Sequence, residues 1–217
     1  MKPEELDPSV TARIPVFISE DDRYFQDKYQ GIPREGYSKL FERMLDRPNI
    51  KVLLDTDFFE VREKLEYDKL FFSGMIDQYY DYCYGRLPYR SLEFNFEKIY
   101  DSIPFQPVAQ VNYPCDNDYT RITEFLHFQY DDTMKKQYDT YKETIIAKEF
   151  SIQYSHSEKE TPYYPIPQKQ NIDLYNMYKM KAEKENVVFL GRLADYSYYN
   201  MDQVVEKALA VAENNKN

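Results

Sequence analysis

Apolar residues recur with a helical period in three segments of the chain. The first is the stretch 35–46, where the pattern ends before Pro48. The second is the stretch 171–185, and the third follows Asn200 near the end of the chain. The apolar positions are Tyr37, Leu40, Phe41, Met44 and Leu45, then Leu174, Tyr178 and Ala182, then Val204, Val205, Ala208, Leu209 and Ala212. This spacing predicts amphipathic helices.

Shorter apolar or alternating runs predict strands between these helices. In 90–96, Leu92, Phe94 and Phe96 alternate with polar residues, which is typical of a half-buried antiparallel strand. The other predicted strands are 51–54, 69–73, 108–113, 120–128, 142–150, 151–154 and 187–190, and 76–84 predicts a short helix ended by Gly85. The pattern indicates an α+β fold with a mostly antiparallel sheet of about four to six strands.

The last strand and helix form a unit whose connection is a candidate binding site. The strand 187–190 leads through Gly191 and Arg192 to Asn200, which is placed to cap the final helix, with Gln203 completing a variant capping box. Amide hydrogens at such a helix start suit an anion or a cofactor carbonyl. The alternative is a routine connection between a strand and a helix.

Charge and composition argue against several classes of protein. The chain has 28 Lys and Arg against 38 Asp and Glu, a formal net charge of -10, which disfavours nucleic-acid and membrane-surface partners. There is no apolar run long enough to span a membrane, and the start MKPEELDPSV does not resemble a signal peptide, so we expect a cytoplasmic protein. Cys83 and Cys115 predict reduced thiols.

The glycines and histidines limit the chemistry. With 5 Gly, the sequence contains neither a dinucleotide fingerprint nor a P-loop, and its 2 His lack the spacing of a zinc site or a hydrolase triad. We therefore predict no metal. The 23 Tyr are the unusual feature, because a tyrosine-rich surface suits sugars, nucleobases and phosphates and equally suits a protein interface.

Several motifs, taken together in order, resemble the C-terminal half of bacterial UDP-galactopyranose mutases, from about residue 3 to residue 213. They are Arg13-Ile14-Pro15-Val16, Tyr24-Phe25 with Tyr29-Gln30-Gly31-Ile32-Pro33, Leu87-Pro88-Tyr89-Arg90-Ser91-Leu92, Tyr119-Thr120-Arg121-Ile122-Thr123-Glu124, Pro162-Tyr163-Tyr164-Pro165, and Gly191-Arg192-Leu193 with Tyr198-Tyr199-Asn200-Met201-Asp202. The resemblance implies an isomerase that interconverts UDP-galactopyranose and UDP-galactofuranose through a reduced-flavin N5 adduct. The flavin is then the nucleophile, and no protein residue is.

The resemblance also implies a division of the chain and a missing part. Residues 1–34 would connect to an absent FAD and helical region, 35–185 would form the antiparallel-sheet substrate domain with flanking helices, and 186–217 would supply the last strand and helix of an incomplete FAD-binding α/β domain. Met1 then marks a truncated reading frame, a split gene product or a deliberately cut chain. We expect FAD binding only when the N-terminal part is supplied, by a separate chain or within a homo-oligomer, and impaired activity without it.

Family motifs assign roles to eight residues. Arg121, Tyr164, Tyr198 and Asn112 fall on positions that bind the substrate, chiefly its diphosphate, while Gly191, Arg192, Met201 and Asp202 fall on positions near FAD. Each has a plainer interpretation. Arg121 can be a strand-surface arginine paired with a carboxylate, and the tyrosines can be ordinary core or rim residues.

Two positions depart from the family pattern and leave other functions open. Phe17 stands where a second diphosphate arginine is usual, with Arg23 as a possible substitute, and Asn200 stands where an aspartate is usual. One alternative function is therefore a non-catalytic remnant or subunit that binds a nucleotide-sugar or a partner chain. A general carbohydrate-binding module is a further alternative, which predicts affinity for free sugar.

Overall fold

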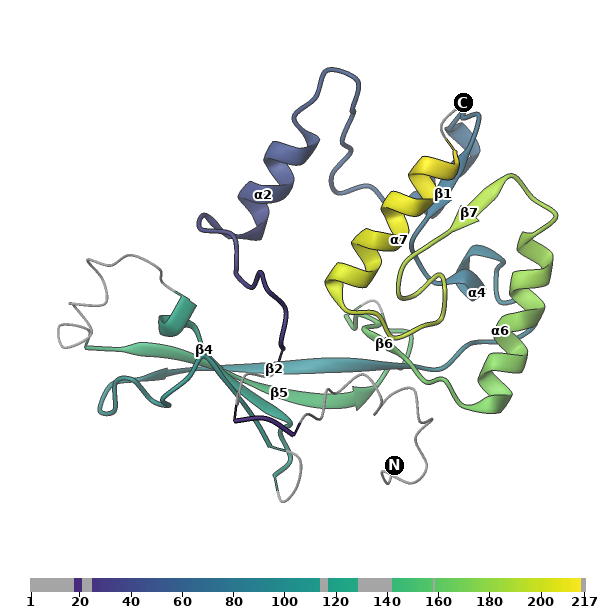
Figure 1. Ribbon diagram of the computed structural model, residues 1–217. Coiled ribbons are helices and arrows are strands. Elements are labelled where there is room, and N and C mark those ends of the chain that lie inside the picture. The colour runs from purple at the N-terminus through teal and green to yellow at the C-terminus, as the bar shows by residue number, and fades with distance from the viewer. Residues whose placement is uncertain (1–17, 21–24, 114–116, 129–141, 158, 216–217) are drawn as a thin grey trace. The chain divides into compact units, whose positions relative to one another are not determined.

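The computed structural model describes residues 18–20, 25–113, 117–128, 142–157 and 159–215. The chain divides into two compact units, one within Thr11–Asp68 and the other within Lys69–Asn217. Each is described by itself below (Figure 1). The divisions predicted after residues 34 and 185 stay predictions.

The smaller unit contains the predicted first helix. It forms as α2 (Gly36–Leu45) and is followed by α3 (Phe58–Val61) and the 3-10 turn η2 (Arg62–Lys64). Asp57 caps α3, where its side chain accepts a hydrogen bond of 2.8 Å from the Phe59 amide. The strand predicted at 51–54 is wrong: Leu54 is 83% exposed and these residues join no ladder in the described part of the chain. An apolar run becomes a strand only where another backbone pairs with it.

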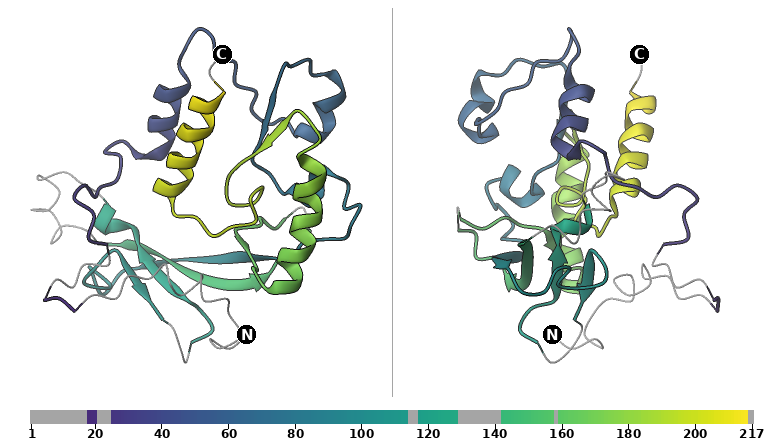
Figure 2. Two further views of the ribbon diagram at one scale, coloured as in Figure 1. Left: turned by 45° about the vertical axis from the view of Figure 1, so that its right-hand side comes forward. Right: turned by 90° about the vertical axis from the view of Figure 1, so that its left-hand side faces the viewer.

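The larger unit is built on a five-stranded antiparallel sheet in the order β3-β4-β5-β2-β6. The strands are β2 (Tyr89–Ile99), β3 (Gln110–Asn112), β4 (Arg121–Glu124), β5 (Thr144–Gln153) and β6 (Tyr164–Pro165). Figure 2 shows β2 and β5 running side by side as its longest members, paired from Arg90 and Gln153 to Ile99 and Thr144. The predicted α+β class with an antiparallel sheet is confirmed.

Two details of this sheet differ from the prediction. The strand expected at 120–128 ends at Glu124, and Phe125–Phe128 form the 3-10 turn η3. The fully buried Glu124 carboxylate accepts hydrogen bonds from the Phe105 and Gln106 amides at 2.9 and 3.0 Å, which holds the strand end against another loop. The apolar face of β2 is also only partly covered, because Phe94 is 41% and Phe96 62% exposed, whereas Tyr89 on the opposite face is fully buried.

A second, two-stranded sheet lies in the same unit. Its strands β1 (Leu70–Phe72) and β7 (Val187–Phe189) pair in parallel, with Leu70 opposite Val187. Around them are α4 (Ile76–Tyr79), α6 (Lys169–Ala182) and α7 (Met201–Asn214). The predicted helix at 76–84 is therefore confirmed only for its first turn, since Asp81 and Tyr82 adopt positive φ values of 50° and 57°, which an α-helix does not contain.

Tyrosines form much of the core of the larger unit. Tyr89, Tyr178 and Tyr196 are at most 1% exposed and pack with Ile76 and Leu87. The Tyr178 hydroxyl donates to the Gly85 carbonyl at 2.6 Å and accepts from the Tyr84 amide at 3.0 Å. A buried phenol ring thus fills apolar space while its hydroxyl satisfies loop backbone groups, which accounts for part of the high tyrosine content.

Candidate functional site

One face of the five-stranded sheet carries most of the predicted substrate residues. Paired residues in an antiparallel sheet point to the same side, and the register aligns Asn112 with Arg121, Arg121 with Glu149, and Glu149 with Phe94. Along β2 the same side recurs at Arg90, which is opposite Tyr164 of β6. We call this side, defined by Arg90, Asn112, Arg121, Glu149 and Tyr164, the arginine face.

Arg121 is held between two neighbours on this face. Its Nε donates to Asn112 Oδ1 at 2.9 Å, and its Nη1 lies 3.6 Å from Glu149 Oε2. The Arg121 side chain is 36% exposed and that of Glu149 15%. The structure thus brings together the two predicted substrate residues Asn112 and Arg121, and adds a carboxylate, Glu149, that the sequence analysis did not identify. Part of the guanidinium remains accessible to a ligand.

Tyr164, Tyr198 and Arg192 form a second group at the β6 edge, which we call the tyrosine–arginine cluster. The two tyrosine rings are stacked, with centroids 5.0 Å apart and planes 6° from parallel. The guanidinium carbon of Arg192 lies 5.0 Å from each ring centroid, and its nitrogens donate to the carbonyls of Tyr163 and Tyr199. Residues assigned by resemblance to the substrate and to FAD therefore meet in one cluster.

The arginine face connects the two groups. Arg121 on β4 and Tyr164 on β6 are separated by three strand spacings across the sheet, about 14 Å, and by four residues along β2, about 13 Å. Between them lies Arg90, whose Nη2 donates to the Ser151 carbonyl at 3.1 Å and to its hydroxyl at 3.0 Å. Sequence analysis did not select Arg90 as a site residue, although the two-residue period of β2 places it on the side of Leu92, Phe94 and Phe96. The face thus gathers positive charge in an acidic chain.

The loop from Gly191 to Tyr199 positions Arg192 and Tyr198. Gly191 has a φ of 99°, a conformation that favours glycine, and its amide donates to Asp195 Oδ2 at 2.9 Å. The same carboxylate oxygen lies 2.7 Å from Lys207 Nζ on α7, and Lys207 also donates to the Tyr199 hydroxyl at 3.2 Å. Gly191 therefore allows the turn of this loop and donates a backbone hydrogen bond within it.

We expect the contacts of Lys207 with this loop to stabilise the folded chain. Burial lowers its pKa, but hydrogen bonds to Asp195 and Tyr199 outweigh burial and raise the pKa above the ordinary value of 10.5. Lys207→Met should lower the free energy of unfolding by about 1 kcal/mol at neutral pH. Because the folded pKa is raised, the stabilisation is complete below pH 10.5 and is lost as the pH rises through the folded value.

Urea unfolding of the wild type and Lys207→Met at several pH values measures this stabilisation. The two proteins should differ at neutral pH and converge in strongly alkaline solution. A difference that grows above pH 10.5 would contradict the role of the lysine charge.

The final helix begins where the sequence predicts. Asn200 occupies the N-cap position of α7, and its backbone amide donates to Gln203 Oε1 at 2.8 Å, as the capping box requires. Met201, which is 63% exposed, and Asp202 lie exposed in the first turn. Their approach to a flavin stays a prediction, as do the ligand contacts of the other site residues.

Some residues singled out from the sequence lie outside the described part of the chain. Phe17, Arg23 and Cys115 lie outside the described residues, and Cys83 is an exposed free thiol. Within the described ranges, no group of three or more His, Cys, Asp and Glu side chains is arranged to hold a metal ion. Among the described helices, none has the length and apolar character needed to cross a membrane.

Comparison with known proteins agrees with the motifs that the site is built on. The profile of the UDP-galactopyranose mutase family matches residues 1–198. The chain is 38% identical over 222 residues to a dTDP-fucopyranose mutase of Escherichia coli, covering 98% of this chain and 56% of that protein. It is 38% identical over 215 residues to a probable UDP-galactopyranose mutase of Klebsiella pneumoniae, covering 98% and 53%.

A UDP-galactopyranose mutase of Mycoplasma pneumoniae is 32% identical over 225 residues, covering 97% of this chain and 54% of that protein. The chain thus spans about half the length of the curated relatives it matches. Because the family profile matches most of the 217 residues, this chain belongs to the UDP-galactopyranose mutase family.

Proposed function

We propose that the chain forms the sugar-nucleotide side of a mutase that interconverts UDP-galactopyranose and UDP-galactofuranose. The observation that carries the proposal is that Asn112, Arg121 and Tyr164 lie along one face of one sheet. The loop residues Tyr198 and Arg192 contact Tyr164 at its edge. A sugar nucleotide presents a base, a diphosphate and a sugar in a row. A diphosphate that lies along this face would receive a guanidinium from one end and tyrosine hydroxyls from the other.

The diphosphate would lie against Arg121. A guanidinium offers a planar fork of donors to phosphate oxygens and neutralises the charge that a departing UDP acquires. Asn112 and Glu149 restrict the orientation of the Arg121 side chain before a ligand binds, which reduces the entropy that binding costs. Tyr164 and Tyr198 would donate hydroxyl hydrogen bonds to the same group from the β6 edge.

The residues of this chain fit one part of a flavin site. Arg192 is fixed by two carbonyls beside the stacked tyrosines, and it would contact FAD phosphate, together with the start of α7. The sequence has no glycine-rich turn to hold the remainder of a dinucleotide. Bound reduced flavin would supply the nucleophile that displaces UDP from the anomeric carbon, and Arg121 would stabilise the leaving diphosphate.

FAD should therefore bind weakly to these 217 residues alone. The visible absorbance of flavin retained by the purified chain, and its mutase turnover with reduced FAD, measure this directly. We expect little of either, and we expect both to rise when the N-terminal region of a mutase is co-expressed. Full turnover with stoichiometric flavin in the chain alone would contradict the expectation. Nucleotide binding with no turnover after co-expression would favour the non-catalytic alternative.

A second candidate substrate is dTDP-fucopyranose. The relative from Escherichia coli that bears this substrate's name matches as well as the probable UDP-galactopyranose mutase from Klebsiella pneumoniae, with 38% identity in each case. Both substrates present the diphosphate that the arginine face would bind, and they differ in the base methyl, the ribose 2′-hydroxyl and the sugar 6-hydroxyl. Calorimetric titration with UDP, dTDP and the two sugar nucleotides distinguishes them. Affinity for free galactose without nucleotide would instead favour a carbohydrate-binding module.

A further inference from the structure

Three phenylalanine side chains gather at one end of the arginine face. We call Phe94 and Phe96 of β2, together with Phe125 of η3, the phenylalanine platform. The rings of Phe96 and Phe125 are stacked, with centroids 6.2 Å apart and planes 21° from parallel, and the Phe94 ring lies 6.4 Å from that of Phe96. The three residues are 41%, 62% and 41% exposed. Large apolar rings grouped at a surface are typical of a site that binds a ligand or another protein.

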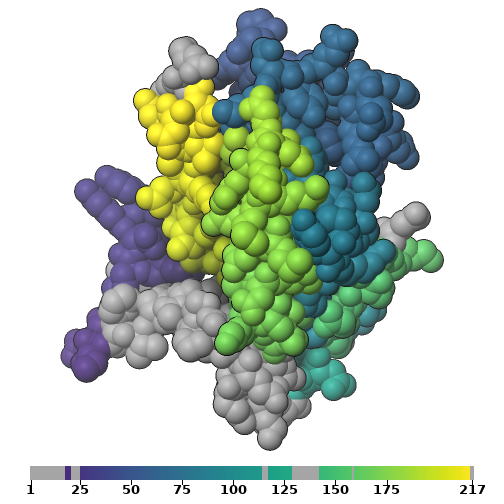
Figure 3. Space-filling model, turned by 90° about the vertical axis from the view of Figure 1, so that its right-hand side faces the viewer, coloured from purple at the N-terminus to yellow at the C-terminus, as the bar shows by residue number. Residues whose placement is uncertain are grey.

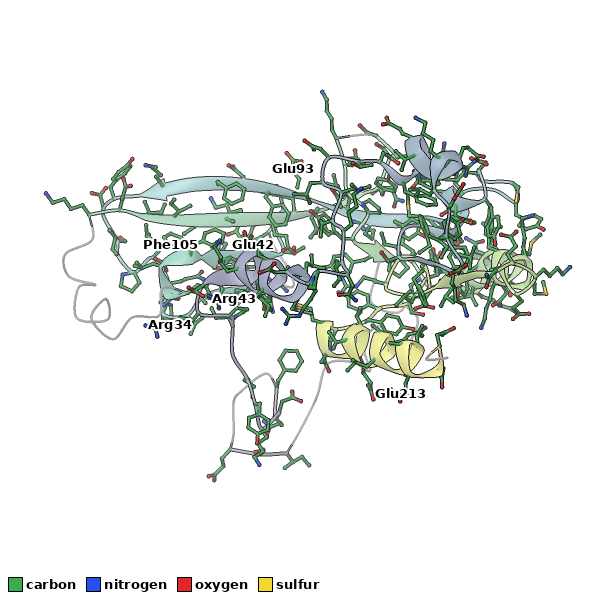
Figure 4. The ribbon with its side chains drawn as sticks, turned by 90° about the horizontal axis from the view of Figure 1, so that it is seen from above. Arg34, Glu42, Arg43, Glu93, Phe105 and Glu213 are labelled. Carbon is green, nitrogen blue, oxygen red and sulfur yellow. The ribbon has the colours of Figure 1, made fainter. Side chains whose placement is uncertain are left out.

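The platform depends on the point at which β4 ends. The strand stops at Glu124, whose carboxylate is held by two loop amides, and the chain turns into η3. Figure 4 shows β2, β5 and β4 side by side, with Phe105 of the adjoining loop labelled. Because β5 lies between the other two strands, the rings of Phe96 and Phe125 reach toward each other across it. Ala147 of β5, which is opposite Phe96, is accordingly only 4% exposed.

The platform lies at the end of the face away from the loop that carries Arg192. That loop contacts Tyr164, which is paired with Arg90 at the start of β2. Phe96 is six residues further along β2, about 20 Å. Arg121 lies between these ends, because it is aligned across β5 with the β2 position four residues after Arg90. Figure 3 shows α6 and α7 at the surface of the first end, whereas Figure 1 shows β4 at the other.

This order sets the direction in which a sugar nucleotide would lie. The anomeric carbon must meet the flavin, which the proposed function places against Arg192 and the start of α7. The sugar therefore belongs at that end of the face, and the diphosphate lies against Arg121. The base is joined to the other side of the diphosphate, so it extends toward Phe96 and Phe125.

We propose that the phenylalanine platform binds the base of the sugar nucleotide by stacking. Flat aromatic side chains hold nucleobases face to face, and the contact needs no hydrogen-bonding partner. The 5-methyl group of thymine would add apolar contact with the same rings, so the platform should favour thymine over uracil. The proposal rests on the proposed function for the position of the diphosphate.

Isothermal titration calorimetry of the full 217-residue chain with UDP and with inorganic pyrophosphate tests the platform. Phe96→Ala with Phe125→Ala should weaken UDP binding by about 5- to 150-fold, the range for loss of an aromatic stack on a base. The same double variant should bind pyrophosphate like the wild type, because pyrophosphate has no base. Arg121→Ala should weaken both ligands, and Phe125→Tyr, which keeps the ring, should retain UDP affinity.

Phe71→Ala is the matched control, since Phe71 lies on β1 of the other sheet and is 47% exposed. It should leave UDP affinity unchanged. Unchanged UDP affinity in the double variant, or equal losses of UDP and pyrophosphate binding, would overturn the proposal. So would a fall in its urea midpoint more than twice that of Phe71→Ala, which would mean that another part of this chain, such as α2, already covers the platform.

The pair dUDP and dTDP tests the preference for thymine, because these ligands differ only in the methyl group. The wild type should bind dTDP about two- to fourfold more tightly than dUDP. The double variant should bind the two equally. Equal affinities in the wild type, or a preference that persists in the double variant, would place the base elsewhere and overturn the proposal.

Failure of the platform and failure of the proposed function give different results. Binding of UDP and pyrophosphate that depends on Arg121 but not on Phe96 and Phe125 would refute only the platform. Absence of any binding that depends on Arg121 would refute the proposed function and the platform with it.

Discussion

Arg121→Ala is expected to weaken the binding of UDP to this chain by about 10- to 100-fold. The side chain would contribute charge-assisted hydrogen bonds to the diphosphate, and a hydrogen bond to a charged group contributes roughly 1.5–3 kcal/mol. In the assembled mutase the same change should lower turnover by about 100- to 1000-fold, because the guanidinium would also stabilise the charge that develops on the departing UDP. Isothermal titration calorimetry and a mutase assay measure the two effects.

Two further variants separate this role from a structural one. Arg121→Lys keeps the charge but loses the fork that spans Asn112 and a phosphate, so we expect an intermediate loss. Lys148→Ala removes a cation from the same sheet on the opposite face, where Lys148 Nζ lies 2.8 Å from Glu97 Oε1. It should leave UDP affinity unchanged. Equal losses from Arg121→Ala and Lys148→Ala would show that net charge, rather than a site, governs binding.

The sequence names candidate site residues one by one, but it does not predict their arrangement. Motifs identified Arg121, Asn112 and Tyr164 singly, but their alignment on one face depends on strand register. Register is set by pairing between segments far apart in the chain, as for Arg121 and Glu149, and no local pattern specifies it. Glu149 was missed for this reason. Arg90 could have been identified from the sequence, since alternation alone places it on the side of Phe94.

The strand predictions that failed have a related cause. Apart from Lys51, the run 51–54 is as apolar as 70–72, yet only the latter pairs with a parallel partner, β7. The alternation in β2 correctly gave a strand but wrongly implied that Phe94 and Phe96 are buried. A pattern records which side of an element is apolar, whereas burial also depends on what packs there. The exposed apolar residues of α7, Met201, Val205 and Leu209, show the same distinction.

Tyr196→Ala is expected to have the largest effect on stability, a loss of about 3–5 kcal/mol in the free energy of unfolding. The Tyr196 side chain is 1% exposed and packs against Tyr89 and Tyr175, at centroid distances of 5.3 and 5.8 Å. Its hydroxyl donates to the Pro88 carbonyl at 2.7 Å and accepts from the Ile166 amide at 3.3 Å. One side chain thus joins the loop at 191–199 to the sections that enter β2 and leave β6.

Tyr196→Phe separates packing from hydrogen bonding, and should cost about 1–2 kcal/mol because it leaves buried backbone groups without their partner. Tyr100→Ala is the matched control, since Tyr100 is 59% exposed, and should change stability by less than about 0.5 kcal/mol. Urea unfolding followed by circular dichroism measures all three. If Tyr196→Ala costs no more than Tyr100→Ala, the tyrosine core does not hold the loop that carries Arg192 and Tyr198. If Tyr196→Ala costs the expected amount, Tyr196 holds the loop that carries Arg192 and Tyr198. Loss of its hydroxyl in Tyr196→Phe should then lower nucleotide affinity, although Tyr196 itself does not face the ligand.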